Sequence, residues 1–175
     1  ENCEIYELDS LQDYRLRTLE QLEIFIISKD DVNKEKLSKS FSDLTGNDYK
    51  ENGELEILGR KIKTLKRSKG SVWFDFKELC EGPRSAKDYI EICTEFHTIF
   101  VSDIPRFTAD NEDSARRFIA LIDECYERKV NLILSLEAAL EDLYKGKKLI
   151  EPYKRTLSRL VEMRSREYLS KPHLG

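Results

Sequence analysis

Two groups of carboxylates have the surroundings that nucleotide chemistry would need. Asp103 follows the apolar run 98–101, and an aspartate at the end of a buried strand lies where open α/β sheets bind their ligands. Asp123 and Glu124 follow a second apolar run, 118–122, and P-loop ATPases use an Asp-Glu pair after a strand to hold magnesium and activate water. Asp103 lacks a following glutamate, so we favour an ordinary strand-to-turn aspartate there.

The role of Asp123 and Glu124 depends on whether the run before them is a strand or a helix. Apolar residues in this region recur at three- and four-residue steps: Ala115, Phe118, Ile119, Ile122, Cys125 and Tyr126. A sustained helical period outweighs a short motif. We therefore predict an amphipathic helix that exposes Asp123 and Glu124, and this interpretation does not favour the magnesium role.

Positively charged side chains gather at two places. Six of them lie on a predicted hairpin: Arg60, Lys61, Lys63, Lys66, Arg67 and Lys69. They could contact an acidic partner or nucleic acid, but lysines also guard a sheet edge against strand pairing, and we favour this second interpretation. Arg155 and Arg159 lie one turn apart on the last predicted helix, with Arg166 near the same face. This row could bind phosphate or carboxylate, although a solvated surface with Glu162 as ion-pair partner explains it equally well.

The phosphate-binding loop G-x-x-x-x-G-K-[ST] is absent from these 175 residues. The Gly-Lys pair Gly146-Lys147 is followed by Lys148, and Glu141 stands where the first glycine should be. The sequence therefore contains no group that could cradle the phosphates of ATP in the way this loop does.

Histidines and cysteines do not form a metal site. His97 and His173 are far apart in sequence, and Cys93 with His97 gives two ligands where a structural zinc needs four. The four cysteines contain no C-x-x-C pair, and three lie in apolar surroundings, so buried reduced thiols and a reducing compartment are favoured. No G-x-S-x-G or cysteine nucleophile context is present. We predict no metal site and no catalytic residue in this chain.

The elements that must position these residues form an α/β core. Runs 72–76, 98–102 and 130–134 predict three strands, and the amphipathic segments 86–96 and 115–126 predict a helix between each pair. Helical connections of this length join parallel strands, so the three strands should lie parallel in one sheet. The predicted fold is α/β.

The segments on either side complete the predicted fold. Runs 55–58 and 60–65 predict a β-hairpin or meander before the small parallel βαβαβ sheet with its flanking helices. At the N-terminus we predict a small β-plus-helix unit with strands at 3–8 and 23–28 and a helix at 31–45 that Gly46 ends. Residues 9–22 read equally as a helix from Asp13 to Leu22 or as an extended run.

The C-terminal segment and the internal boundary follow from turn residues. We predict a short helix at 140–144 and a final helix that starts at Pro152 and buries four side chains: Leu157, Leu160, Val161 and Tyr168. The polar segment NDYKENG is the best boundary and divides the chain into residues 1–50 and 51–175.

Composition limits the classes of partner. Charged residues make up 37% and hydrophobic residues 39% of the chain, with a net charge of -4, which argues against general affinity for nucleic acid and for anionic membranes. We also expect no partner that is a specific nucleic-acid sequence. No apolar run approaches the roughly 20 residues that a transmembrane helix needs. The first residue is not Met, so we expect a piece of a longer protein.

Five separated blocks, in order, resemble the ZapE-type ATPases, the bacterial relatives of the mitochondrial AFG-like ATPases. The blocks are DYRLRTL, VWFDFKELC, FHTIFVSDIP, ARRFIALIDECYERKV, and LSRLVEM with EYL. The resemblance runs from about Cys3 to His173. It implies an AAA-type P-loop ATPase, of which this chain is the C-terminal portion, after the segments that carry Walker A, Walker B, the sensor asparagine and the arginine finger.

The resemblance also implies how the portions divide the chemistry. ATP and magnesium are expected in the full-length protein and neither in this fragment, which we predict to be inactive alone as an ATP hydrolase. Residues 1–50 would be a remnant or lid-like part of the ATPase core, and residues 51–175 the C-terminal domain. Family-like positions that could contact phosphate or a partner, together with Asp103, are Arg15, Arg116, Arg117, Arg155 and Arg159.

Partners and location are implied in the same way. Bacterial members are associated with cell division through the tubulin-like FtsZ ring, and mitochondrial members with the turnover of respiratory-chain subunits. The block RRFIALIDECYER is closer to the bacterial branch, so we expect a cytoplasmic protein that acts on FtsZ or another protein target and forms a homo-oligomer through the full-length ATPase. The mitochondrion is the alternative location. A non-catalytic domain that docks through the basic hairpin is the alternative function.

Overall fold

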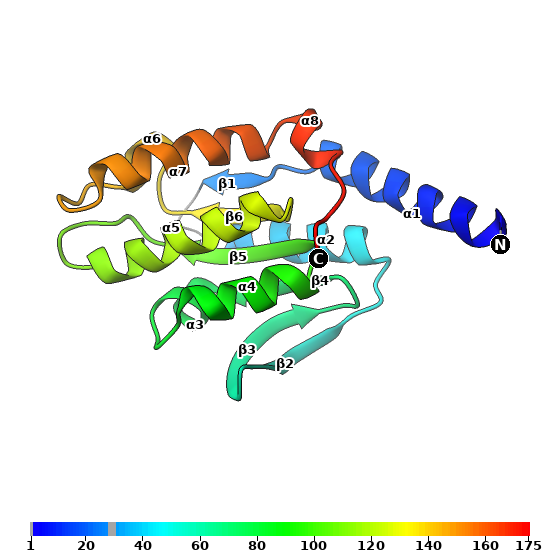
Figure 1. Cartoon of the computed structure of the whole chain (residues 1–175), viewed down its shortest axis with the longest axis horizontal. Helices are drawn as coiled ribbons and strands as arrows, with labels where there is room; N and C mark the ends of the chain where they lie inside the picture. Colours follow the sequence, from blue (N-terminus) through cyan, green and yellow to red (C-terminus); the bar gives the residue numbers. More distant parts are fainter. Residues whose placement is uncertain (1, 28–30) are drawn as a thin grey trace.

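Helices cover both faces of a six-stranded sheet in the computed structural model, which describes residues 2–27 and 31–175, with residues 2–9 described by their backbone alone (Figure 1). The strand order is β1-β6-β5-β4-β3-β2. The strands are β1 (Phe25–Ile27), β2 (Lys50–Ile57), β3 (Arg60–Arg67), β4 (Ser71–Asp75), β5 (Thr98–Ile104) and β6 (Asn131–Leu136). The helices are α1 (Asn2–Gln21), α2 (Val32–Thr45), α3 (Phe76–Cys80), α4 (Ala86–Glu95), α5 (Glu112–Glu127), α6 (Leu140–Leu143), α7 (Ile150–Met163) and α8 (Arg166–Leu169).

The predicted parallel core is confirmed. β4 pairs with β5 from Ser71 opposite Thr98, and β5 pairs with β6 from Thr98 opposite Asn131, both in parallel register. Every residue of β6 is buried, because a parallel strand in the middle of a sheet has helices on both sides. The segment 118–124 lies within α5, so the helical interpretation of the Asp123-Glu124 motif is also confirmed.

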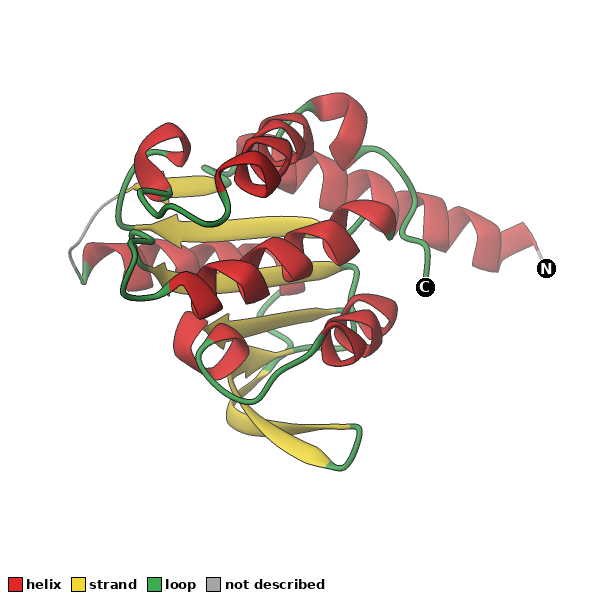
Figure 2. Cartoon of the chain, turned by 60° about the vertical axis from the view of Figure 1, so that its left-hand side comes forward, coloured by secondary structure: helices red, strands yellow, loops and turns green. Residues whose placement is uncertain are grey.

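The predicted meander is confirmed as an antiparallel extension of this sheet. β2 and β3 form a hairpin, and β3 continues into antiparallel pairing with β4. Leu58 and Gly59 make the two-residue turn with φ of 50° and 75°, the left-handed conformation that such hairpin turns require. Figure 2 shows this hairpin extending beyond the helices that cover the rest of the sheet.

Two apolar cores form on the two faces of the sheet. The larger core lies under α3, α4, α5 and α7 and includes Phe76, Phe118 and Leu160. The smaller core lies on the face with α1 and α2 and includes Phe41 and Phe100. The predicted helix 31–45 is confirmed as α2, and Gly46 ends it with φ of 62°.

The predicted strand at residues 3–8 is wrong, because α1 runs through it. Ile5 and Leu8 are three residues apart, a helical step that breaks the alternation a strand needs. The ambiguous stretch after it is helix as well. The strand at 23–28 is confirmed over Phe25–Ile27, and Ser28 lies outside the described residues. β1 pairs with β6 in the common sheet, while the division of the chain at residue 50 stays a prediction.

The final helix differs from its prediction at both ends. α7 begins at Ile150, and Pro152 occupies its first turn, where a missing N–H costs no hydrogen bond. The helix buries Leu160, but Val161 is 40% exposed, contrary to the prediction. Tyr168 is buried on the separate helix α8, because the chain turns between Met163 and Arg166.

Two observations complete the description. None of the described helices combines the length and apolar character that crossing a bilayer requires. Among the described residues Cys80, Cys93 and Cys125 are free and buried, as predicted for reduced thiols.

Candidate functional site

The carboxyl ends of β4, β5 and β6 place four polar side chains at one edge of the parallel sheet. Asp103 has φ of 61°, because β5 is irregular between Val101 and Ile104. Its backbone N–H donates to Ser135 Oγ on β6 at 2.8 Å. On the neighbouring strand pair, Trp73 Nε1–H donates to Ser102 Oγ at 3.1 Å. These two hydrogen bonds hold the carboxyl ends of the three strands together, and this is where α/β sheets of this kind bind ligands.

Two carboxylates and one ammonium group meet at this edge. Lys34 Nζ on α2 lies 3.4 Å from Asp103 Oδ2, and both side chains are about half exposed. Asp75, at the end of β4, caps α3 by accepting a hydrogen bond from the Lys77 N–H at 2.9 Å. Partial burial, with a smaller contribution from the negative charge of Asp103, raises the pKa of Asp75.

The chemistry open to this edge is limited. Among the described residues no group of three histidine, cysteine, aspartate or glutamate side chains is placed to hold a metal ion. Asp103 and Asp75 already have partners within the protein: Asp103 pairs with Lys34, and Asp75 caps α3. The edge can bind a polar ligand, but it lacks the backbone cradle and lysine that phosphoryl transfer uses.

The loop between α6 and α7 does present backbone N–H groups to an anion, and this anion is the carboxylate of Glu112. The N–H groups of Lys147 and Lys148 donate to Glu112 Oε1 at 2.7 and 3.1 Å, and Tyr144 Oη–H donates to Glu112 Oε2 at 2.7 Å. These hydrogen bonds, the Lys147 bond above all, lower the pKa of Glu112. A Cβ at Gly146 would come within 2.5 Å of Glu112 Oε1, so this glycine allows the close approach. The Gly146-Lys147 pair therefore anchors a loop.

The predicted arginine row on α7 faces carboxylates of α5. Arg159 Nη1 lies 2.5 Å and Arg155 Nη2 3.3 Å from the two oxygens of Asp123. Arg159 also stacks on the Tyr126 ring, 4.8 Å from its centroid. Glu162, the expected partner, instead accepts a hydrogen bond from Tyr126 Oη at 2.7 Å. The row thus joins two helices.

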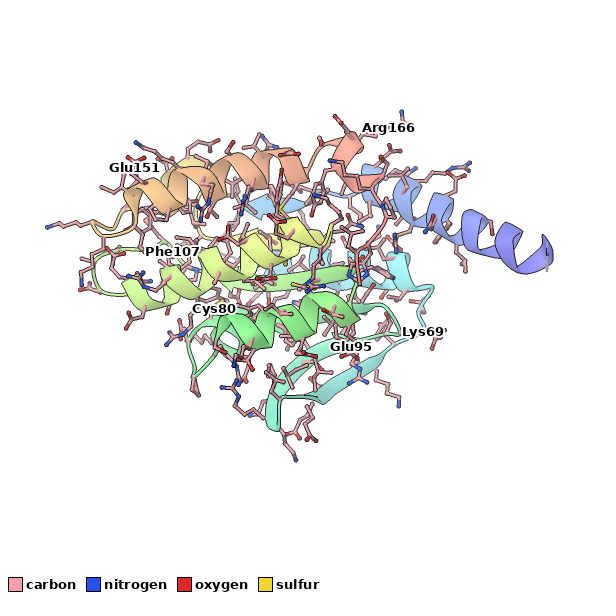
Figure 3. The ribbon with its side chains drawn as sticks, in the orientation of Figure 1. Lys69, Cys80, Glu95, Phe107, Glu151 and Arg166 are labelled. Carbon is pink, nitrogen blue, oxygen red and sulfur yellow. The ribbon has the colours of Figure 1, made fainter. Side chains whose placement is uncertain are left out.

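Arg166 does not extend this row. It lies on α8, beyond the end of α7 opposite to Glu151 (Figure 3), and its Nε is 2.7 Å from Glu20 Oε1 on α1. On α5, Arg116 is exposed and Arg117 Nη1–H donates to the Cys80 carbonyl at 3.4 Å. The family-like arginines therefore do not converge on one site.

The cations of the basic hairpin run along β3 and are not concentrated at its turn. Three of them face acidic residues of β2 in the cross-strand register: Glu56 opposite Lys61, Glu54 opposite Lys63 and Glu51 opposite Lys66. Arg60 pairs with the buried Asp88 and donates to the Pro83 carbonyl at 2.7 Å. Most of the positive charge on this strand is therefore balanced within the protein.

Lys66 departs furthest from a solvated charge. It is 7% exposed, and its Nζ donates to Ser38 Oγ at 2.7 Å and to Tyr49 Oη at 3.0 Å. The ammonium also lies 4.3 Å from the Tyr49 ring centroid. The exposed cations that have no acidic residue opposite them lie at the base of the hairpin, where Arg67 faces Lys50 and where Lys69 lies beyond β3, away from the hairpin turn (Figure 3).

Some polar groups of these sites had no clear signal in the sequence. Asp75 could have been found, because it lies near the end of the strand predicted at 72–76, next to the strand of Asp103. Lys34, Ser135 and Glu112 come close to their partners through contacts between elements that local patterns do not specify.

Comparisons with known proteins place the chain among ATPases. The family model described as AFG1-like ATPase matches residues 1–172. The cell division protein ZapE of Escherichia coli strain K12 is 38% identical over 175 residues, which cover 100% of this chain and 47% of that protein. The lactation elevated protein 1 homolog B of Danio rerio is 33% identical over 147 residues, 82% of this chain and 29% of that protein. No solved structure matches the chain. The chain spans about half the length of ZapE and less than a third of the length of the Danio rerio protein.

Proposed function

This chain belongs to the AFG1-like ATPase family, and from that premise we propose that it is the C-terminal module of a protein that hydrolyses ATP and acts in cell division. The observation that carries the proposal is the match along the whole chain to a protein named for cell division, of which the chain covers 47%. ATP and magnesium belong to the remainder of the protein, because these 175 residues lack the phosphate-binding loop.

The geometry favours a non-catalytic, positioning role for this module in the ATPase. The carboxylates at the carboxyl ends of β4 and β5 already have partners within the protein, and the arginines of α7 are paired with α5. Such a module positions other parts of the protein or its target and does not itself transfer phosphate. The cytoplasm is the proposed location, and assembly of the whole ATPase into a homo-oligomer is part of the same proposal.

The first prediction is that the 175-residue chain alone does not turn over ATP, whereas the whole protein does so with magnesium. Phosphoryl transfer needs preorganised charge around the phosphates, and this chain has no loop that supplies it. The measurement is phosphate release by the chain, by its Asp103→Ala variant and by the whole protein. Turnover that copurifies with the chain and is abolished by Asp103→Ala would refute the proposed division of labour.

A second candidate function is docking of the whole protein on an acidic target, for which FtsZ is the first candidate. The favouring observation is the exposed basic group at the hairpin base: Lys50, Arg67 and Lys69. Lys50 and Arg67 lie opposite each other, so this group, unlike Lys61, Lys63 and Lys66, lacks an acidic residue across the strand pair. Its attraction reaches about one Debye length, roughly 8 Å at physiological ionic strength.

We predict that the double variant Arg67→Glu, Lys69→Glu binds an acidic target more slowly than wild type, and that the difference shrinks at high salt. Lys66 is left unchanged because it is buried, so its reversal would destabilise the fold. The control is Lys145→Glu, Lys154→Glu, which changes the net charge equally on other elements. Association rates are measured at two salt concentrations with FtsZ as target, and equal rates for the two variants would exclude docking by the hairpin base.

A further inference from the structure

A cavity of about 560 Å³ lies between α1 and the chain segment after α8. Arg15 lines it from α1, with Ser10 and Gln12 beside it, and Ser170 and Lys171 line it from the opposite side. Figure 1 shows the last turns of α1 running beside α8 and the C-terminal segment. The cavity thus has a cationic group on each wall and hydroxyl and amide groups between them.

Arg15 is partly buried and has no hydrogen bond or ion pair of its guanidinium among the residues that the structure describes. Burial without a partner lowers the pKa of Arg15, because the charged form loses hydration and gains no opposite charge. Arg17, two residues later, is exposed and has its partner: its Nη2 lies 2.8 Å from Asp13 Oδ2. Asp13 also lines the cavity, but its charge is balanced by Arg17.

The wall opposite Arg15 is fixed in place by the C-terminal segment. Leu174 N–H donates to the Arg128 carbonyl at 2.9 Å, and His173 Nε2 lies 2.6 Å from the Cys93 carbonyl oxygen. The positive charge of Arg15 also acts on His97. Burial is the main cause that lowers the pKa of His97 to about 4, and the charge of Arg15 is the second cause. The cavity therefore combines a rigid wall with an unbalanced positive field.

We propose that this cavity binds a phosphate group, held by the guanidinium of Arg15 and the ammonium of Lys171. A guanidinium fork matches two oxygens of a tetrahedral oxyanion, and two cations balance a dianion better than a single carboxylate. Inorganic phosphate and the phosphate of a nucleotide share this chemistry. A bound phosphate would join α1 to the C-terminal segment. The proposal rests on the geometry of this chain and does not depend on where ATP is hydrolysed.

The experiment measures binding of inorganic phosphate, ADP without magnesium, and adenosine to the 175-residue chain by calorimetry at constant ionic strength. We expect wild type and the control Arg116→Gln, which removes an exposed arginine outside the cavity, to bind phosphate or ADP. Arg15→Gln should lose about tenfold or more in affinity, since charge-assisted hydrogen bonds are lost. Binding of ADP but not of phosphate identifies a nucleotide site, and similar binding of both identifies a phosphate site. No binding by wild type, or equal affinity of the Arg15→Gln and Arg116→Gln variants, overturns the proposal.

A second readout is independent of any variant's stability. In wild type the NMR titration of His97 should shift to higher pH when phosphate is added, because a bound anion offsets the charge of Arg15. The groups facing His97 are Arg15, His173 and Thr98. An unchanged His97 titration at saturating phosphate would place the anion elsewhere and overturn the assignment even if Arg15→Gln failed to fold.

Discussion

Replacing Asp88 with alanine should lower the free energy of unfolding by about 3 kcal/mol, because it removes the buried partner of an ion pair. Asp88 is fully buried and pairs with Arg60, and its Oδ2 accepts a hydrogen bond from the Ser85 N–H at 2.7 Å. Removal leaves the Ser85 N–H at the start of α4 without its cap and leaves Arg60 without its carboxylate. The figure is at the lower end for a broken buried pair, because Arg60 is 40% exposed and water can reach it.

The measurement is urea unfolding of wild type and Asp88→Ala, followed by circular dichroism. The matched control is Lys61→Ala, which removes a pair with Glu54 in which both side chains are exposed, and which should cost at most about 0.5 kcal/mol. A loss below about 1 kcal/mol for Asp88→Ala would show that the pair is not a stabilising anchor.

The Arg60–Asp88 pair matters for function because it fixes the hairpin. Arg60 begins β3 next to the turn, and it also donates to the Pro83 carbonyl before α4. The turn of the hairpin is thereby tied to the loop that precedes α4. If the hairpin base docks on a target, it does so as a rigid extension of the sheet, and binding does not have to order it first.

The sequence predicted the parallel core because its signals are local. The apolar runs before Asp103 and after Arg128, and the three- and four-residue steps between them, specify strand, helix and strand without any knowledge of their neighbours. The strand predicted at 3–8 failed because few apolar residues were available to distinguish the two periods. The length of α1 and its packing against α2 and α8 follow from contacts between elements.

The candidate site was less predictable for a physical reason. Charges were found in the right segments, but their partners lie far away in sequence: Lys34 with Asp103, and Asp123 with Arg159. Lys66 looked like one cation among six, yet the Tyr49 ring and two hydroxyl groups bury it. Charge patterns identify where a surface is basic, and only the fold decides which charges remain available to a ligand.

Acidification from pH 7 to pH 5 should destabilise the protein by about 2 kcal/mol through His97 alone. Burial is the main cause that lowers the pKa of His97 from 6.5 to about 4, and the positive charges of Arg15 and His173 add to it. Between these two values the unfolded chain binds a proton that the folded protein does not bind. Stability is therefore fully present above pH 6.5 and falls as the pH drops toward 4.

The variant His97→Gln isolates this contribution, because glutamine does not titrate and the carboxylates of both proteins titrate alike. Urea unfolding at pH 7 and pH 5 should give a loss of stability that is about 2 kcal/mol smaller in the variant than in wild type. His97 Nδ1 lies 2.8 Å from Thr98 Oγ1, and an amide group can keep a hydrogen bond to that hydroxyl. Equal losses in the two proteins would mean that the pKa of His97 is the same in the folded and the unfolded protein, so that neither burial nor the charge of Arg15 lowers it.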